Sequence, residues 1–134
     1  MNHYLACWKK YAVFTGRASR TEFWSWWLWN LALFFLASFL LQLVTFNALN
    51  ATAPGQQRSV PIAVVALYWI GNLYILLSLL PSIGVTIRRL HDQDRSGWWI
   101  LLNVICALGG IILLVIQTTP GTEGENRFGA PPAS

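Results

Sequence analysis

The sequence predicts an all-α integral membrane protein, in which a short interfacial helix precedes three transmembrane helices. Three observations predict it: few charges, long uncharged apolar runs, and basic residues clustered beside those runs. Only 10% of the 134 residues are charged and 55% are hydrophobic, whereas a soluble domain carries about 25% charged residues. Because so few charges cannot cover a soluble surface, we expect the apolar surface to face lipid.

Three stretches are long enough to cross a bilayer. They predict helices over residues 20–46, 60–87 and 97–118, followed by a tail over 119–134. At a rise of about 1.5 Å per residue, roughly 20 residues cross the hydrocarbon layer. Pro81 removes a backbone donor, so we expect the second helix to kink near it.

Residues 2–15 predict the interfacial helix. Leu5 and Trp8 share one face, while Lys9 and Lys10 lie toward the other. Tryptophan, tyrosine and lysine together suit the headgroup layer of a membrane. We therefore expect this helix to lie flat on the inner leaflet.

The first long helix has a clear start signal. Ser19 and Glu22 have the spacing of a capping box, in which the hydroxyl accepts from the Glu22 amide and the carboxylate reaches back to the Ser19 amide. A group of tryptophans follows, and we expect it to form an aromatic belt at the membrane interface. This group comprises Trp24, Trp26, Trp27 and Trp29.

The distribution of lysine and arginine predicts the orientation. If the three runs all cross, seven of the nine basic residues share one side, and Arg58 and Arg127 lie on the other. The positive-inside rule then puts the N-terminus in the cytoplasm and the C-terminus outside. The alternative is that Gly109 and Gly110 open a turn, so that the third run returns as a re-entrant hairpin and leaves the tail in the cytoplasm.

The loop between the second and third runs concentrates polar residues in Arg88-Arg89-Leu90-His91-Asp92-Gln93-Asp94-Arg95-Ser96-Gly97-Trp98-Trp99. One interpretation is a tight cytoplasmic turn in which Ser96 caps the third helix. A second is a binding site for an anionic lipid headgroup, because paired arginines bind phosphate through bidentate hydrogen bonds.

A third interpretation of the loop is an acid/base or metal site that uses His91 with Asp92 or Asp94. The metal version has little support, because the other histidine is His3 and no cysteine lies nearby in the sequence. We expect no metal and no cofactor.

The loop and the start of the first long helix are expected on the same side of the membrane. Glu22 is then placed to pair with Arg88 or Arg89, which predicts a structured cytoplasmic cap. The candidate residues for binding a protein partner or an anionic lipid are Arg17, Arg20, Glu22, Arg88, Arg89, His91, Asp92 and Arg95.

Each predicted span holds one asparagine: Asn30, Asn72 and Asn103. Asn30 and Asn103 lie at a similar depth and could pair. We expect these amides to form interhelical hydrogen bonds, and a translocation path lined by them is the alternative.

Three motifs resemble those of one family. The first motif is Trp8, Tyr11, Phe14, Gly16-Arg17-Ala18-Ser19-Arg20 and Glu22-Phe23-Trp24. The second is Arg88-Arg89-Leu90-His91-Asp92 with Arg95-Ser96-Gly97-Trp98-Trp99, and the third is Gly121, Gly124 and Asn126-Arg127-Phe128-Gly129. Together they resemble the DUF805 family of small bacterial inner-membrane proteins of unknown function.

The resemblance implies a bacterial cytoplasmic-membrane location and no particular reaction. Gln93-Asp94 departs from the small Thr-Gly pair often found in the family and adds an acidic group to the loop. The tail motif, which contains Asn126 and Arg127, poses a question. A three-span topology puts it across the membrane from the other two motifs, so either it serves a different purpose outside or the third run does not cross.

The leading functional hypothesis is a non-catalytic assembly, regulatory or lipid-binding subunit. Its expected partners are membrane lipid and either further copies of the chain or another membrane protein. One alternative is a small oligomeric channel or transporter lined by the asparagines. A weaker one is a lipid-modifying enzyme that uses His91 and Asp92. Nucleic acid is not an expected partner, because the basic residues flank the apolar runs instead of covering a face.

Overall fold

The computed structural model describes residues 2–51, 60–105 and 108–132. The described ranges contain helices and no β-strand, so the predicted all-α fold is confirmed. The elements are α1 (Asn2–Lys9), α2 (Arg20–Asn50), α3 (Ile62–Asp92), the 3-10 helix η1 (Gly97–Leu101), α4 (Leu102–Ile105) and α5 (Gly109–Thr118). Two compact units divide the chain: residues 1–28 with 79–134 form unit 1, and residues 29–78 form unit 2.

Within the described residues, helices α2 and α3 are the two that are long and apolar enough to cross a membrane. Each has 31 residues and contains an 18-residue stretch with a mean hydropathy of 2.0. A helix of that length measures about 46 Å, which exceeds the ~30 Å hydrocarbon thickness of a bilayer. Both continue beyond their predicted ends, to Asn50 and Asp92. Pro81 lies buried within α3, and a kink there stays a prediction.

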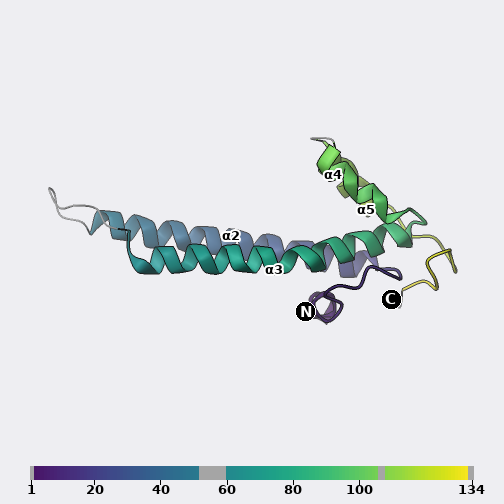
Figure 1. Cartoon of the computed structure of the whole chain (residues 1–134), viewed down its shortest axis with the longest axis horizontal. Helices are drawn as coiled ribbons and strands as arrows, with labels where there is room; N and C mark the ends of the chain where they lie inside the picture. The colour runs from purple at the N-terminus through teal and green to yellow at the C-terminus, as the bar shows by residue number, and fades with distance from the viewer. Residues whose placement is uncertain (1, 52–59, 106–107, 133–134) are drawn as a thin grey trace. The chain divides into compact units, whose positions relative to one another are not determined.

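In unit 2, α2 and α3 run side by side (Figure 1) and expose large apolar side chains, such as Phe35 and Leu76. Tyr74 Oη donates a hydrogen bond to Asn30 Oδ1 over 2.6 Å. Asn72 Nδ2 donates to the Tyr68 carbonyl of its own helix over 2.8 Å. Asn30 therefore accepts a hydrogen bond between α2 and α3, as expected. The Asn72 amide instead donates a hydrogen bond to the backbone of its own helix, α3.

The third apolar run is divided into η1, α4 and α5. Helices α4 and α5 fold back on each other (Figure 1). A Cβ atom on Gly109 would lie 1.7 Å from the Leu102 carbonyl oxygen, so the close approach requires glycine. The single helix predicted over residues 97–118 is therefore wrong. A third crossing is not confirmed, since the ten residues of α5 span only about 15 Å.

The core of unit 1 is small and rich in aromatic rings. It consists of Cys7, Ala18, Phe23, Trp26 and Val85, with Tyr4, Trp8 and Trp24 packed against it. The Trp26 ring stacks on Tyr4 at 5.1 Å between centroids, and its Nε1 donates to Ser82 Oγ over 3.0 Å. Trp26 therefore belongs to the core and not to the predicted interfacial belt.

Helix α1 ends at Lys9 instead of near residue 15. The chain then turns, and Gly16 takes a φ of 80°, a conformation that favours glycine. An interfacial position of α1 stays a prediction. Arg58 and Cys106 lie outside the described residues, as does most of the loop that joins the two long helices.

Candidate functional site: a buried arginine–carboxylate cap

Five charged side chains are buried together in unit 1 at the ends of α2 and α3. They are Arg17, Glu22, Arg88, Arg89 and Asp92, with exposed fractions of 8% or less. We call this group, with the tail segment that contacts it, the cap. Burying a charge is costly unless an opposite charge and further hydrogen bonds compensate it. The pairing of these five groups therefore determines whether the cap is stable.

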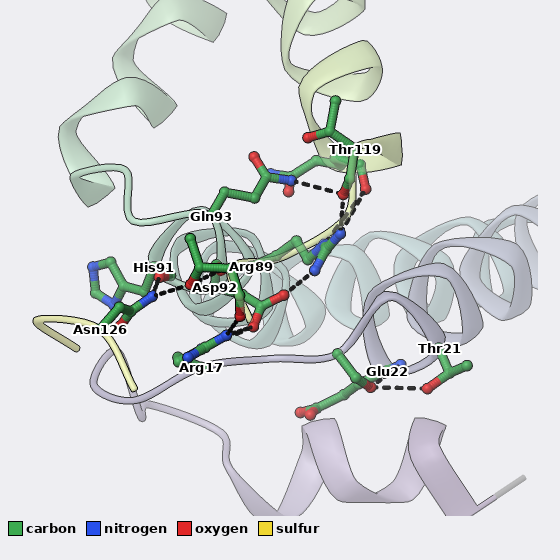
Figure 2. A network of polar contacts seen from close by, with 12 residues as sticks. Arg17, Thr21, Glu22, Arg89, His91, Asp92, Gln93, Thr119 and Asn126 are labelled. Atoms are coloured by element: carbon green, nitrogen blue, oxygen red, sulfur yellow. Dashed lines mark hydrogen bonds and ion pairs between the residues drawn. The ribbon is translucent and has the colours of Figure 1, made fainter. Parts of the chain in front are cut away.

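Asp92 is the central acceptor, because two arginines reach its carboxylate from different segments (Figure 2). Arg17 Nε donates to Oδ1 over 2.9 Å. Arg89 Nη1, one turn earlier in α3, donates to Oδ2. Both carboxylate oxygens are thus occupied by guanidinium groups.

The remaining donors of Arg17 hold the C-terminal tail. Its Nη1 donates to the Gly124 carbonyl and its Nη2 to the Thr122 carbonyl, each over 2.6 Å. The Thr122 amide in turn donates to the Asp92 carbonyl over 2.9 Å. The tail is therefore bonded to the segment before α2 and to the end of α3.

Arg89 ties the end of the α4–α5 segment to the same place. Its Nη2 donates to the Thr119 carbonyl, and its Nε lies 3.4 Å from the Gln117 carbonyl oxygen. Gln93 Nε2 donates to the Ile116 carbonyl over 2.7 Å. Gln93 thus contributes to the cap, although it departs from the family pattern.

The tail motif packs on His91. The Phe128 ring stacks on the imidazole with 3.9 Å between centroids and an interplanar angle of 5°. Asn126 Nδ2 donates to the His91 carbonyl over 2.9 Å (Figure 2). At the surface, Arg127 pairs with Asp94 at 3.0 Å. Asn126 and Arg127 therefore lie beside the other two motifs, not apart from them as a three-span topology predicts.

A second ion pair confirms a sequence prediction. Arg88 Nη1 lies 2.7 Å from Glu22 Oε1, and Lys10 Nζ approaches the same carboxylate at 3.4 Å. The Glu22 amide donates to Ser19 Oγ over 3.1 Å. This hydrogen bond confirms Ser19 as the residue that caps the N-terminus of helix α2. The Glu22 carboxylate pairs with Arg88 instead of closing the predicted capping box.

The Cys7 thiol lies next to this pair. Its Sγ donates to Glu22 Oε1 over 3.9 Å. Burial, and then the negative charge of Glu22, raises the pKa of the thiol to about 11. Cys7 therefore stays protonated at neutral pH and behaves as a small buried residue.

Two predicted arginines lie outside the buried network. Arg95 packs over the Trp99 ring at 4.9 Å, and Ser96 Oγ accepts from the Trp98 amide, which confirms the predicted cap of the third run. Arg20 is exposed and forms no ion pair with any residue that the structure describes.

Arg20 lies on a pocket of about 350 Å³ at the edge of the cap. The pocket is lined by Arg17, Ser19, Arg20, Thr21, Arg89, Asp92, Pro120, Gly121, Thr122, Pro131 and Pro132. The lining thus contains three guanidinium groups, three hydroxyl groups and one carboxylate. Such a lining can bind an anion, because guanidinium and hydroxyl donors match phosphate oxygens.

The same geometry gives little support to acid/base chemistry. The Asp92 carboxylate is engaged in ion pairs with two arginines. His91 is held by its ring stack and by the Gly16 carbonyl, 3.2 Å from Nδ1. Within the described ranges, no group of three potential metal ligands comes together.

Fold and site define a small helical protein with two candidate membrane spans and a buried arginine–carboxylate cap. The profile of the family described as "Protein of unknown function (DUF805)" matches residues 11–130. This chain belongs to the DUF805 family.

The relatives that the chain resembles include two from Escherichia coli K12. "Inner membrane protein YhaH" is 37% identical, over 98% of this chain and 97% of the relative. "Inner membrane protein YhaI" is 36% identical, over 98% and 96%. A more distant relative, "Uncharacterized protein YiiR", is 27% identical over 87% and 83%. No solved structure matches the chain.

Proposed function

We propose that this protein is a non-catalytic subunit of the bacterial inner membrane whose cap binds the phosphate of an anionic lipid headgroup. Two relatives that match almost the whole chain are named as inner membrane proteins, which supports the location. Helices α2 and α3 cross the bilayer. The positive-inside rule puts the cap in the cytoplasm, because Arg17 and Arg20 precede α2 and Arg88 and Arg89 end α3.

The charge balance of the pocket carries the proposal. Arg17 and Arg89 share the single carboxylate of Asp92, so the lining keeps an excess of positive charge. Arg20 adds an exposed guanidinium at the rim. A phosphate that binds there would compensate this excess and accept bidentate hydrogen bonds.

The start of α2 adds to the attraction. Thr21 Oγ1 and Ser19 Oγ lie 2.8 Å apart in the pocket lining, where the first amides of a helix carry partial positive charge. The first apolar residue of α2 is Phe23, three positions after Arg20, which corresponds to about 5 Å along the helix. The pocket therefore lies at headgroup depth, where lipid phosphates are found.

Lipid binding by the purified full chain tests the proposal. Native mass spectrometry would measure retention of phosphatidylglycerol and phosphatidylcholine by the wild type, by Arg20→Gln and by Lys9→Gln. Lys9 is an exposed basic residue outside the pocket, so its variant loses the same charge at another place. We expect Arg20→Gln alone to reduce phosphatidylglycerol retention, by about tenfold for a lost charged hydrogen bond. Equal retention by all three proteins would overturn the proposal.

The other hypotheses gain less from the geometry. Asn72 bonds to its own helix, which is not the arrangement that a channel lining needs, and a translocation path stays a prediction. His91 and Asp92 are engaged in holding the cap, so the lipid-modifying enzyme gains no support. Association with further copies or with another membrane protein also stays a prediction.

A further inference from the structure

We propose that residues 97–118 form a re-entrant hairpin that inserts into the cytoplasmic leaflet and returns, so that the C-terminal tail lies on the same side of the membrane as Arg17. In this arrangement the apolar exterior of α4 and α5 contacts the acyl chains of that one leaflet. This topology and this lipid contact are separate from phosphate binding at the pocket.

Both ends of the run lie next to the C-terminal end of α3. At its start, the Arg95 amide donates to the Leu90 carbonyl over 2.9 Å. At its end, Gln93 Nε2 donates to the Ile116 carbonyl over 2.7 Å. A straight helix over residues 97–118 would separate its ends by about 30 Å. The chain must therefore reverse between them.

The reversal is built into the sequence. Gly109 lets α5 approach the backbone of α4 at Leu102, and a Cβ on Gly110 would come within 3.3 Å of Asn103 Oδ1. Close helix contact through small residues is the usual way in which helices pack in a membrane. The pair Gly109-Gly110 thus marks the start of the return helix.

The exposed surface of the hairpin identifies its occupant. Ile105 is 78% exposed, and Leu108, Ile111 and Val115 are each 60% exposed or more. No charged residue occurs from position 97 to position 122. A contiguous apolar surface of this kind is not stable in water. Since α5 has ten residues, about 15 Å, its length matches one leaflet and not the ~30 Å hydrocarbon core.

The base of the hairpin carries the expected interface residues. Trp98 is 77% exposed and Trp99 lies next to it, and exposed tryptophans are enriched at headgroup level. Arg95 packs over the Trp99 ring, which keeps a cation beside the phosphates. The hairpin thus has an aromatic base and exposed apolar side chains on α4 and α5.

The distribution of basic residues supports the hairpin independently. With a re-entrant hairpin, eight of the nine basic residues lie on the cytoplasmic side and only Arg58 lies outside. With a crossing, Arg127 joins Arg58 outside. The hairpin therefore satisfies the positive-inside rule better than three crossings do.

Labelling of single cysteines from each side of the membrane tests the topology. In a Cys7→Ala, Cys106→Ala background, Ala130→Cys would be treated with a membrane-impermeant maleimide in right-side-out and inside-out vesicles. His3→Cys reports the N-terminal side and Val60→Cys the opposite side, and all three positions are exposed. We expect Ala130→Cys to label with the pattern of His3→Cys. A pattern like that of Val60→Cys would overturn the proposal.

A distance measurement tests the reversal itself and does not depend on lipid binding at the pocket. Spin labels at Trp98→Cys and Thr118→Cys would occupy two exposed positions, twenty residues apart. A continuous helix gives about 30 Å between them, whereas the hairpin gives a distance well below ~20 Å. A distance near 30 Å would exclude the hairpin even if the anionic lipid still binds.

Discussion

Arg17 and Asp92 form a buried ion pair of 2.9 Å although 75 positions separate them in the sequence. Arg17 precedes α2 and Asp92 ends α3, and the remaining Arg17 donors bind the carbonyls of Thr122 and Gly124 in the tail. One guanidinium thus joins the three segments that carry the family motifs. The tail is therefore part of the same structural unit as the helix ends.

Replacing Asp92 by asparagine removes the charge that compensates two buried arginines. We expect Asp92→Asn to lower the free energy of unfolding by about 3–5 kcal/mol and to release the tail. Thermal unfolding in detergent and trypsin cleavage at Arg127 measure the two effects. Asp94→Asn is the control, because its exposed pair with Arg127 contributes less than about 1 kcal/mol. Equal stability of the two variants would contradict the central position of Asp92.

The pair of Glu22 and Arg88 predicts a strong energetic coupling. Glu22→Gln leaves Arg88 as a buried and uncompensated charge, at a cost of about 3–5 kcal/mol. Arg88→Met leaves Glu22 paired only with the partly exposed Lys10, so we expect a smaller loss. The double variant has neither charge, so we expect it to be more stable than the sum of the single effects predicts. A double-mutant cycle of thermal stabilities measures the coupling. Additive effects would show that the two groups do not interact.

Gly121 is predicted to be intolerant of a side chain. A Cβ atom there would lie 2.0 Å from Asp92 Oδ2, so Gly121→Ala must displace either the tail or the carboxylate. We expect a loss of about 1–3 kcal/mol. In Gly71→Ala the Cβ atom meets nothing within 4 Å, and alanine favours the helix. Thermal stabilities of the two variants make the comparison, and a neutral Gly121→Ala would contradict the tail contact.

The raised pKa of Cys7, about 11, predicts an unreactive thiol. Because the thiolate is the reactive form, alkylation at pH 8 should be more than ~100-fold slower in the folded protein than after unfolding. A Cys106→Ser variant leaves Cys7 as the single thiol, and mass spectrometry follows its modification by iodoacetamide. Rapid labelling of the folded protein would place Cys7 outside the core.

The sequence predicted contacts that depend on charge and local spacing. The sequence predicts that Glu22 pairs with Arg88 or Arg89, because these residues flank apolar runs. The positions of Ser19 and Ser96 predict helix caps. The docked tail could not be predicted in this way. Arg17 binds it mainly through backbone carbonyls, and these carry no side-chain signal.

For a similar reason, the sequence does not predict the burial of Trp26. An interfacial tryptophan and a core tryptophan look alike in a run of Trp and Phe residues. The stacking on Tyr4 and the hydrogen bond to Ser82 identify Trp26 as a core residue. The division of the third run had a signal in Gly109-Gly110. The number of apolar residues does not distinguish a transmembrane helix from a re-entrant hairpin, because both structures place the same apolar residues in lipid.

The central claim is that a lipid phosphate binds beside Arg20. Solid-state NMR of the full chain in phosphatidylglycerol bilayers, with carbon-labelled arginine Cζ atoms, measures the distance from each guanidinium carbon to lipid phosphorus. We expect a signal corresponding to about 4–5 Å, the separation in a guanidinium–phosphate hydrogen-bonded pair, and its loss in Arg20→Gln. The same signal in Arg20→Gln, or no guanidinium within that distance in the wild type, would contradict the claim.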